Sequence, residues 1–169
     1  VPNFVLDDSI VLPFNDLEST EKLIHKHKEE LAGVILEPLA RGYMIPEENF
    51  LKGLREITED EGIPLIFDEV MTGFRLALGG AQEFFGVTPD IVALGKIIGG
   101  GLPIGVCAGK ANILKAMSPN RTEASQVYLF HSGTYNANAT VLTAGLATIK
   151  VLEKPGTYSH INELAESIR

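Results

Sequence analysis

The segment Pro64–Val70, with the sequence PLIFDEV, constrains the fold of this chain more than any other feature. It is a continuous apolar run that is interrupted only by two adjacent acids, Asp68 and Glu69. A strand that is apolar on both faces is typical of a parallel sheet covered by helices on both sides. Three shorter apolar runs, at 34–36, 91–94 and 103–108, predict further strands.

Helix-like segments alternate with these strands. The charged, periodic segment 20–32 predicts a surface helix, and the mainly apolar segment 136–152 predicts a long one. In the segment 46–61, four apolar residues fall on one face of an amphipathic helix: Phe50, Leu51, Leu54 and Ile57. Strands that alternate with helices predict an α/β fold, here a three-layer α/β/α arrangement around a mostly parallel sheet. In such sheets, ligands bind at the carboxyl ends of the strands.

Composition narrows the range of functions. The 169 residues suffice for one domain with a core, and the net charge of −8 argues against binding to a nucleic-acid backbone. No apolar run is long enough to span a bilayer, and no spacing of Cys and His predicts a metal site. The single cysteine, Cys107, lies in an apolar run, which predicts a core position. The single cysteine and the absence of a leader pattern lead us to expect a cytoplasmic protein.

The acid at the end of the buried strand, Asp68, admits three interpretations. It is costly unless paired, so it could cap a helix or form a structural ion pair. In a nucleotide hydrolase it would belong to a Walker B strand, but the partner loop G-x-x-x-x-G-K-[ST] is missing. Gly95-Lys96 is followed by Ile97, and Asp90 stands where the first glycine is required. In the third interpretation, the carboxylate keeps a pyridinium nitrogen protonated, so that the ring can accept electrons.

Lys96 stands among apolar and glycine residues in the run Leu94–Pro103, with the sequence LGKIIGGGLP. Loss of water around an amine favours its neutral, nucleophilic form, which attacks aldehydes. The alternative is a solvated lysine in a flexible loop. The glycines of this run do not follow the G-x-G-x-x-G pattern of dinucleotide-binding loops.

The segment His131–Asn136, with the sequence HSGTYN, comes directly before the long predicted helix. Small hydroxyls and backbone N–H groups at the start of a helix suit an anion such as phosphate. The simpler interpretation is an ordinary N-cap, formed by Ser132, Thr134 or Asn136.

Together these segments resemble the class III aminotransferases, which belong to the fold-type I enzymes that use pyridoxal 5′-phosphate (PLP). The stretch that carries the resemblance is Leu65–Gly105, LIFDEVMTGFRLALGGAQEFFGVTPDIVALGKIIGGGLPIG. The separation of 96 − 68 = 28 residues between Asp68 and Lys96 matches the family's spacing from the ring-nitrogen aspartate to the Schiff-base lysine. The resemblance implies that residues 1–169 are a single partial domain, the lysine-bearing portion of the family's PLP-binding large domain.

The resemblance also implies a role for each of four residues. Lys96 would bind the cofactor as a Schiff base and then carry protons, and Asp68 would pair with the pyridinium N–H, which makes these two the candidate catalytic residues. Val70 would pack on the face of the ring. Thr134 would hydrogen-bond the phosphate of the cofactor in the neighbouring subunit, because family sites are built across a dimer. We therefore expect a homodimer that acts on a small amino acid or amine.

Within the family, the run Met71–Gln82 looks most like glutamate-1-semialdehyde 2,1-aminomutase, an enzyme of tetrapyrrole precursor synthesis. The segments 39–43 and 131–138 depart from that pattern, so an aminotransferase for another amino acid or amine is the alternative. A rival from a different class is a non-catalytic α/β binding domain in which Asp68 and Lys96 form a structural pair. Family members are much longer, so we expect a fragment that is inactive alone.

Overall fold

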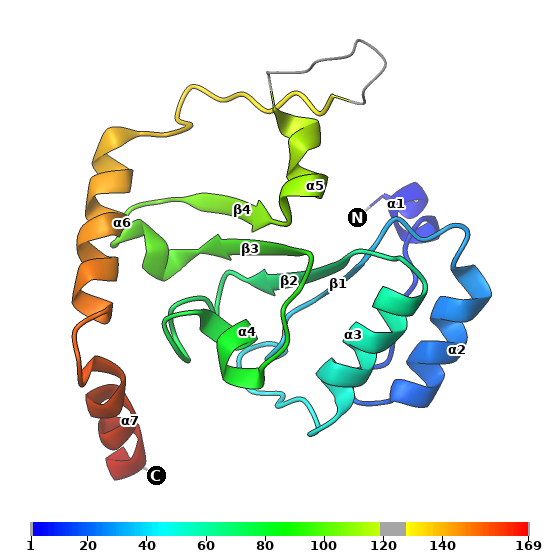
Figure 1. Ribbon diagram of the computed structural model, residues 1–169, viewed down its shortest axis with the longest axis horizontal. Coiled ribbons are helices and arrows are strands. Elements are labelled where there is room, and N and C mark those ends of the chain that lie inside the picture. Colours follow the sequence, from blue (N-terminus) through cyan, green and yellow to red (C-terminus); the bar gives the residue numbers. More distant parts are fainter. Residues whose placement is uncertain (1, 119–127, 169) are drawn as a thin grey trace.

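The structure is a computed structural model that describes residues 2–118 and 128–168. Figure 1 shows a sheet with helices packed against it and α6 running across one end of the strands. The elements follow one another in this order: α1 (Asn3–Asp7), α2 (Leu17–His27), β1 (Val34–Leu36), α3 (Phe50–Asp60), β2 (Leu65–Glu69), α4 (Gly80–Phe85), β3 (Ile91–Gly95), the 3₁₀ turn η1 (Lys96–Gly99), β4 (Gly105–Gly109), α5 (Ala111–Leu114), the 3₁₀ turn η2 (Lys115–Met117), α6 (Ala139–Leu152) and α7 (Thr157–Ile168).

The four strands form one sheet in the order β1-β2-β3-β4. β1, β2 and β3 run parallel, and β4 pairs with β3 antiparallel. The predicted mostly parallel α/β sheet is therefore confirmed, with all four apolar runs forming strands. The carboxyl ends of β1, β2 and β3 lie at one edge of the sheet, which is the edge nearer to α6 in Figure 1.

The core lies between one face of this sheet and the helices α2 and α3. Figure 1 shows these two helices side by side, and buried side chains from both join the strand residues in one cluster. All four residues of the predicted apolar face of α3 are buried, as expected from their spacing: Phe50, Leu51, Leu54 and Ile57. From the sheet, Leu65 and Phe67 of β2 are fully buried against them.

Three helices have boundaries that differ from those predicted. α2 ends at His27 and begins at Leu17, where the Asp16 carboxylate accepts a hydrogen bond from the backbone N–H of Ser19. α3 begins at Phe50 rather than at residue 46, and α6 begins at Ala139 rather than at residue 136. The apolar periodicity located the middle of each helix, whereas local side-chain caps and turns set its ends.

The opposite face of the sheet carries Asp68. Side chains alternate along β2, so Asp68 points away from the buried Leu65 and Phe67. The strand register places Asp68 beside Ala93, and Ala93 beside Cys107 of β4. Cys107 is exposed, so the predicted core position was wrong. The short apolar run that contains Cys107 forms β4, whose Cys107 face is not covered by the described residues.

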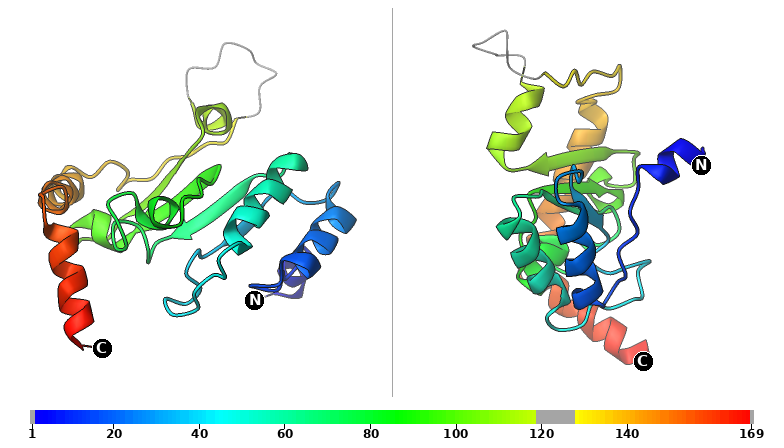
Figure 2. Two further views of the ribbon diagram at one scale, coloured as in Figure 1. Left: turned by 60° about the horizontal axis from the view of Figure 1, so that its bottom comes forward. Right: turned by 90° about the vertical axis from the view of Figure 1, so that its right-hand side faces the viewer.

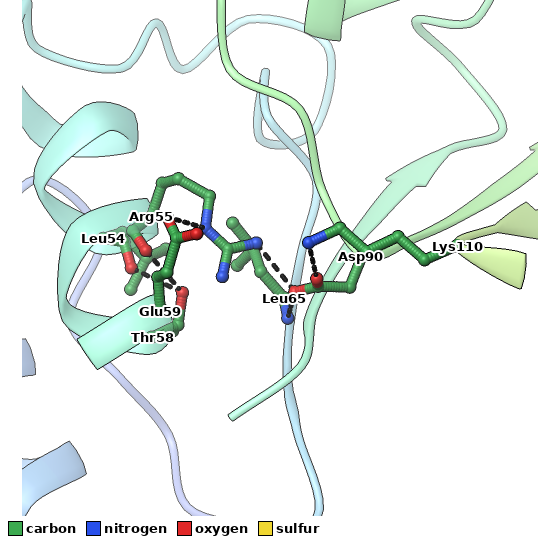
Figure 3. A network of polar contacts seen from close by, with 7 residues as sticks. All are labelled: Leu54, Arg55, Thr58, Glu59, Leu65, Asp90 and Lys110. Atoms are coloured by element: carbon green, nitrogen blue, oxygen red, sulfur yellow. Dashed lines mark hydrogen bonds and ion pairs between the residues drawn. The ribbon is translucent and has the colours of Figure 1, made fainter. Parts of the chain in front are cut away.

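The amino ends of β2 and β3 are joined by the carboxylate of Asp90 (Figure 3). It accepts hydrogen bonds from the backbone N–H of Leu65 at 2.8 Å and from Arg55 Nη1 of α3 at 2.7 Å, and it pairs with Lys110 Nζ at 2.6 Å. Burial alone would raise the pKa of Asp90, but the bonds from Lys110, Leu65 and Arg55 outweigh it and lower the pKa to about 2. One ionised side chain thus connects α3, both central strands and the residue after β4.

Candidate active site

The carboxyl ends of β2 and β3 bring the two main candidate residues to the same edge of the sheet. Asp68 is paired in register with Ala93, and Lys96 follows three residues later, directly after β3. Strands rise about 3.3 Å per residue and lie about 4.8 Å apart, so the two residues lie on neighbouring strand ends, on the order of 10 Å from each other. This edge is where parallel α/β sheets bind their ligands.

Asp68 is half-buried and is oriented by its own backbone. Its Oδ1 accepts a hydrogen bond from the backbone N–H of Val70 at 3.0 Å. Neither carboxylate oxygen of Asp68 has a further hydrogen bond or ion pair with the residues that the structure describes. The carboxylate is therefore held in place by one bond and retains capacity to accept a proton donor from a ligand.

Lys96 is exposed, so the loss of water expected around its amine is not provided by the described residues, and its backbone conformation is uncommon. Its φ of 50° lies in the left-handed region, which residues with a Cβ rarely adopt. Within the described part of the chain, Lys96 forms no ion pair, with Asp68 or with any other residue. The structural pair that the rival interpretation requires is thus not formed.

Val70 contacts Asp68 and the residue before Lys96. Besides donating to Asp68, it packs so closely on the strand that carries Lys96 that a Cβ added to Gly95 would stand 3.3 Å from Val70 Cγ1. The structure therefore brings together Asp68, Val70 and Lys96 at one edge of the sheet. The strand pattern of the sequence predicted Asp68 and Lys96 for this edge, whereas Val70 entered only through the family resemblance, and the structure shows how closely it meets Gly95.

Thr134, the fourth candidate, is not joined to this group. It is exposed, in the turn before α6, and no described contact links it to Asp68 or Lys96. The N-cap of α6 is Asn138, whose Oδ1 accepts from the backbone N–H groups of Thr140 and Val141. The prediction that Ser132, Thr134 or Asn136 caps this helix was wrong, because the helix starts three residues later than its apolar pattern suggested.

Glu69, next to Asp68, has a role that the sequence did not predict. Its carboxylate is fully buried and accepts hydrogen bonds from the Thr72 hydroxyl, the Ala81 N–H and both the backbone and side-chain N–H groups of Gln82. These bonds tie the start of α4 to the end of β2 and fix the loop that follows Asp68. The only signal in the sequence was a second acid in an otherwise apolar strand.

A cavity lies at the start of β4, which pairs with the end of β3. Its volume is about 690 Å³, and it is lined by the residues 103–106 at the start of β4 and by residues between 131 and 142. Neither Asp68 nor Lys96 lines it.

The described residues contain no cluster of His, Cys, Asp or Glu able to hold a metal ion. None of their helices is both long and apolar enough to cross a bilayer.

The donor set at the carboxyl edge fits a flat aldehyde cofactor of the PLP type. Such a group needs a carboxylate for a protonated ring nitrogen and an amine for an aldehyde on the far side of the ring. Asp68 offers the first with free acceptor capacity, and Lys96 offers the second without a competing ion pair.

Comparison with known proteins also supports a site for a cofactor of the PLP type. The family model described as aminotransferase class-III matches residues 1–169, which is the whole chain. An omega-transaminase from Sphaerobacter thermophilus is 43% identical, with a TM-score of 0.91 over 99% of this chain. A solved transaminase with PLP bound is 32% identical over 98% of this chain, with a TM-score of 0.88. A glutamate-1-semialdehyde-aminomutase from Pseudomonas aeruginosa PAO1 is 31% identical over 94%, with a TM-score of 0.78.

These solved proteins are much longer than the chain. The match covers 38% of the omega-transaminase, 38% of the PLP-bound transaminase and 36% of the aminomutase. The similarity therefore concerns the sheet and helices described above, and the remaining parts of those proteins have no counterpart in the 169 residues.

Proposed function

This chain belongs to the class III aminotransferases, and on that premise we propose that it is the lysine-bearing part of a PLP-dependent amino-group transferase. One observation supports the proposal most directly: an amine and a carboxylate stand unpaired with each other at the carboxyl ends of two neighbouring parallel strands. We further propose that residues 1–169 form one partial domain and are inactive alone, since they span 38% of the omega-transaminase they resemble.

When bound, PLP supplies an aldehyde for an amine to attack and a protonated ring that draws electron density from the reacting carbon. In this proposal, Lys96 Nζ holds the cofactor and, when free, moves a proton at the substrate carbon that carries the amine. Asp68 accepts the ring N–H and keeps that proton in place. Val70 packs against the ring face and helps to exclude water. The bond from the Val70 N–H keeps Asp68 oriented for this task.

The Lys96→Ala substitution separates this proposal from a non-catalytic binding domain. Because Lys96 is exposed and makes no ion pair, we expect the melting temperature of the cofactor-free, full-length protein to stay within about 2 °C, while cofactor colour and activity are lost. A matched control is Lys150→Ala, at an exposed position of α6, which should keep both. A large loss of stability in Lys96→Ala with unchanged cofactor binding would contradict the proposal.

Two reactions are candidates for the substrate chemistry. Identity of 43% to an omega-transaminase favours transfer of the amine between two molecules, whereas the run Met71–Gln82 favours an aminomutase that returns the amine to the same molecule. The full-length protein should be offered an amine donor with an oxo acid, and glutamate-1-semialdehyde alone. Stoichiometric oxo product from the donor identifies a transaminase, and conversion of the semialdehyde without a second substrate identifies an aminomutase.

We also propose a cytoplasmic homodimer whose site is shared across subunits, with Thr134 binding the phosphate of the partner's cofactor. The exposure of Thr134 in a turn supports this, because its hydroxyl is available to another subunit. Thr134→Ala should raise the Kd for PLP about tenfold, as expected for one charge-assisted hydrogen bond. The control Thr143→Ala, at an exposed position of α6, should leave the Kd unchanged. A monomer in sedimentation, or an unchanged Kd for Thr134→Ala, would contradict this part.

A further inference from the structure

Helix α6 touches the turn that begins at Lys96. In Figure 1 the helix runs past the carboxyl edge of the sheet, and in the left view of Figure 2 the orange helix α6 lies beside the green part of the chain. The contact between α6 and η1 is among the most extensive between elements of the described chain. The lysine turn is thus fixed against a helix as well as within the sheet.

The contact is made by backbone atoms at two glycines. A Cβ added to Gly145 of α6 would overlap with the carbonyl oxygen of Ile98, which lies two residues after Lys96. A Cβ added to Gly100 would stand 2.5 Å from the carbonyl oxygen of Ala144. Gly145 is the only buried residue of α6, although glycine is among the least favourable residues in the interior of a helix. Its presence there is explained by the close approach to the lysine turn.

The backbone of Lys96 is therefore confined from both sides. Before it, Gly95 packs on Val70 so that a Cβ would stand 3.3 Å from Val70 Cγ1. After it, the turn rests on Gly145 without an intervening side chain. Between these two contacts, Lys96 adopts its left-handed φ of 50°, a conformation that persists only where the surroundings enforce it.

We propose that Gly145 is a positioning residue that sets the place and backbone conformation of Lys96 through the carbonyl of Ile98. The inference rests on the proposed function, because it assigns the purpose of this contact to the lysine that holds the cofactor. Gly145 itself touches neither substrate nor cofactor in this account. It acts by letting α6 approach the turn more closely than any other residue type allows.

The contact distances set the size of the expected effect. A carbon–oxygen pair held at 2.5 Å has to separate by about 1 Å to reach an ordinary van der Waals distance. A substitution at either glycine should therefore displace the turn by about 1 Å. Displacement of a reacting group by this amount typically costs about 100-fold in rate. The contact involves main-chain oxygens, so shrinking the Ile98 side chain should not restore the rate.

The test uses the full-length protein and a matched pair of glycines. Gly100→Ala and Gly101→Ala both place a Cβ at a positive φ, of 59° and 91°, but only Gly100 faces α6, while Gly101 has open space. Gly145→Ala disturbs the same contact from the helix side, where its Cβ would overlap with the Ile98 carbonyl oxygen. The readout is the rate at which cofactor-free protein, mixed with PLP, acquires a borohydride-reducible label on Lys96. The melting temperature of the cofactor-free protein controls for folding.

We expect labelling to slow about 100-fold in Gly145→Ala and Gly100→Ala and less than threefold in Gly101→Ala, with kcat falling in parallel and KM nearly unchanged. Wild-type labelling rates in Gly145→Ala, or equal slowing in Gly100→Ala and Gly101→Ala, would overturn the inference. If Gly145→Ala does not fold, the comparison of Gly100→Ala with Gly101→Ala decides. Failure of the wild-type protein to label at Lys96 would instead overturn the proposed function.

Discussion

The substitution Asp90→Asn should lower the stability of the protein by an amount that depends on pH. The pKa of Asp90 falls from 3.8 to about 2 on folding, so the native state binds this proton less readily than the unfolded chain does. The stabilisation is therefore fully present above about pH 4 and is lost as the pH falls towards 2. At 1.36 kcal/mol per pKa unit, it amounts to about 2.5 kcal/mol at neutral pH. The bond from Lys110 lowers the pKa of Asp90 most, but Lys110 is half exposed and water screens its charge, so about 2.5 kcal/mol is an upper value to which the nearly buried Arg55 contributes with less screening.

The assay is urea unfolding of the full-length protein, followed by far-ultraviolet circular dichroism, at a series of pH values from 2.5 to 7. The difference in free energy of unfolding between wild type and Asp90→Asn should be about 2.5 kcal/mol at pH 7 and should shrink below pH 4. A control is Glu18→Gln, which removes an exposed pair with Lys22 and should change stability by less than about 0.5 kcal/mol.

Two results would refute this reasoning. A difference between wild type and Asp90→Asn that is the same at pH 3 and pH 7 would mean that the lost contacts, and not the ionisation of the carboxylate, set the effect. A difference no larger than that of Glu18→Gln at pH 7 would mean that the free-energy cost of burying the Asp90 carboxylate equals the stabilisation by its three hydrogen-bond donors.

Three further substitutions, one of them paired with a control, test other parts of the structure by thermal unfolding. Glu69→Gln should lower stability by about 3 kcal/mol, because it turns an amide donor towards the buried donors that now bind the carboxylate; an unchanged melting temperature would contradict this. Asn138→Ala should lower the free energy of unfolding by about 1 kcal/mol because it removes the N-cap of α6, and Ser132→Ala should leave it unchanged. A larger loss in Ser132→Ala than in Asn138→Ala would show that Ser132 caps the helix. Tyr158→Phe should cost about 1 kcal/mol by removing the hydroxyl bond to the Phe74 carbonyl at 2.9 Å, and a loss below about 0.3 kcal/mol would show that this bond is not formed.

The strands and the placement of the site could be predicted from the sequence because both depend on local patterns. A continuous apolar run gave the central strand, and an acid or a lysine directly after such a run falls at the carboxyl edge of a parallel sheet. The confirmed positions of Asp68 and Lys96 follow from this rule alone. Their chemical roles came from the resemblance of a long motif to a family, and they stay predictions.

The remaining features depend on partners that are distant in the sequence. Asp90 accepts a hydrogen bond from Arg55, which is 35 residues before it, and Glu69 accepts one from Gln82, which is 13 residues after it. Neither network therefore leaves a local pattern in the sequence. The exposure of Cys107 depends on what covers β4, which a run of apolar letters does not specify. The start of α6 was set by the cap at Asn138, which the apolar periodicity does not reveal.

The most direct test of the account is to find where the full-length protein binds PLP. The protein is mixed with PLP and reduced with borohydride, which converts a lysine-bound cofactor into a stable secondary amine, and the labelled peptide is identified by mass spectrometry. The account predicts a pyridoxyl group on Lys96, and none on Lys110 or Lys150, which serve as internal controls. A folded, full-length protein that carries no label, or carries it on another lysine, would contradict the account.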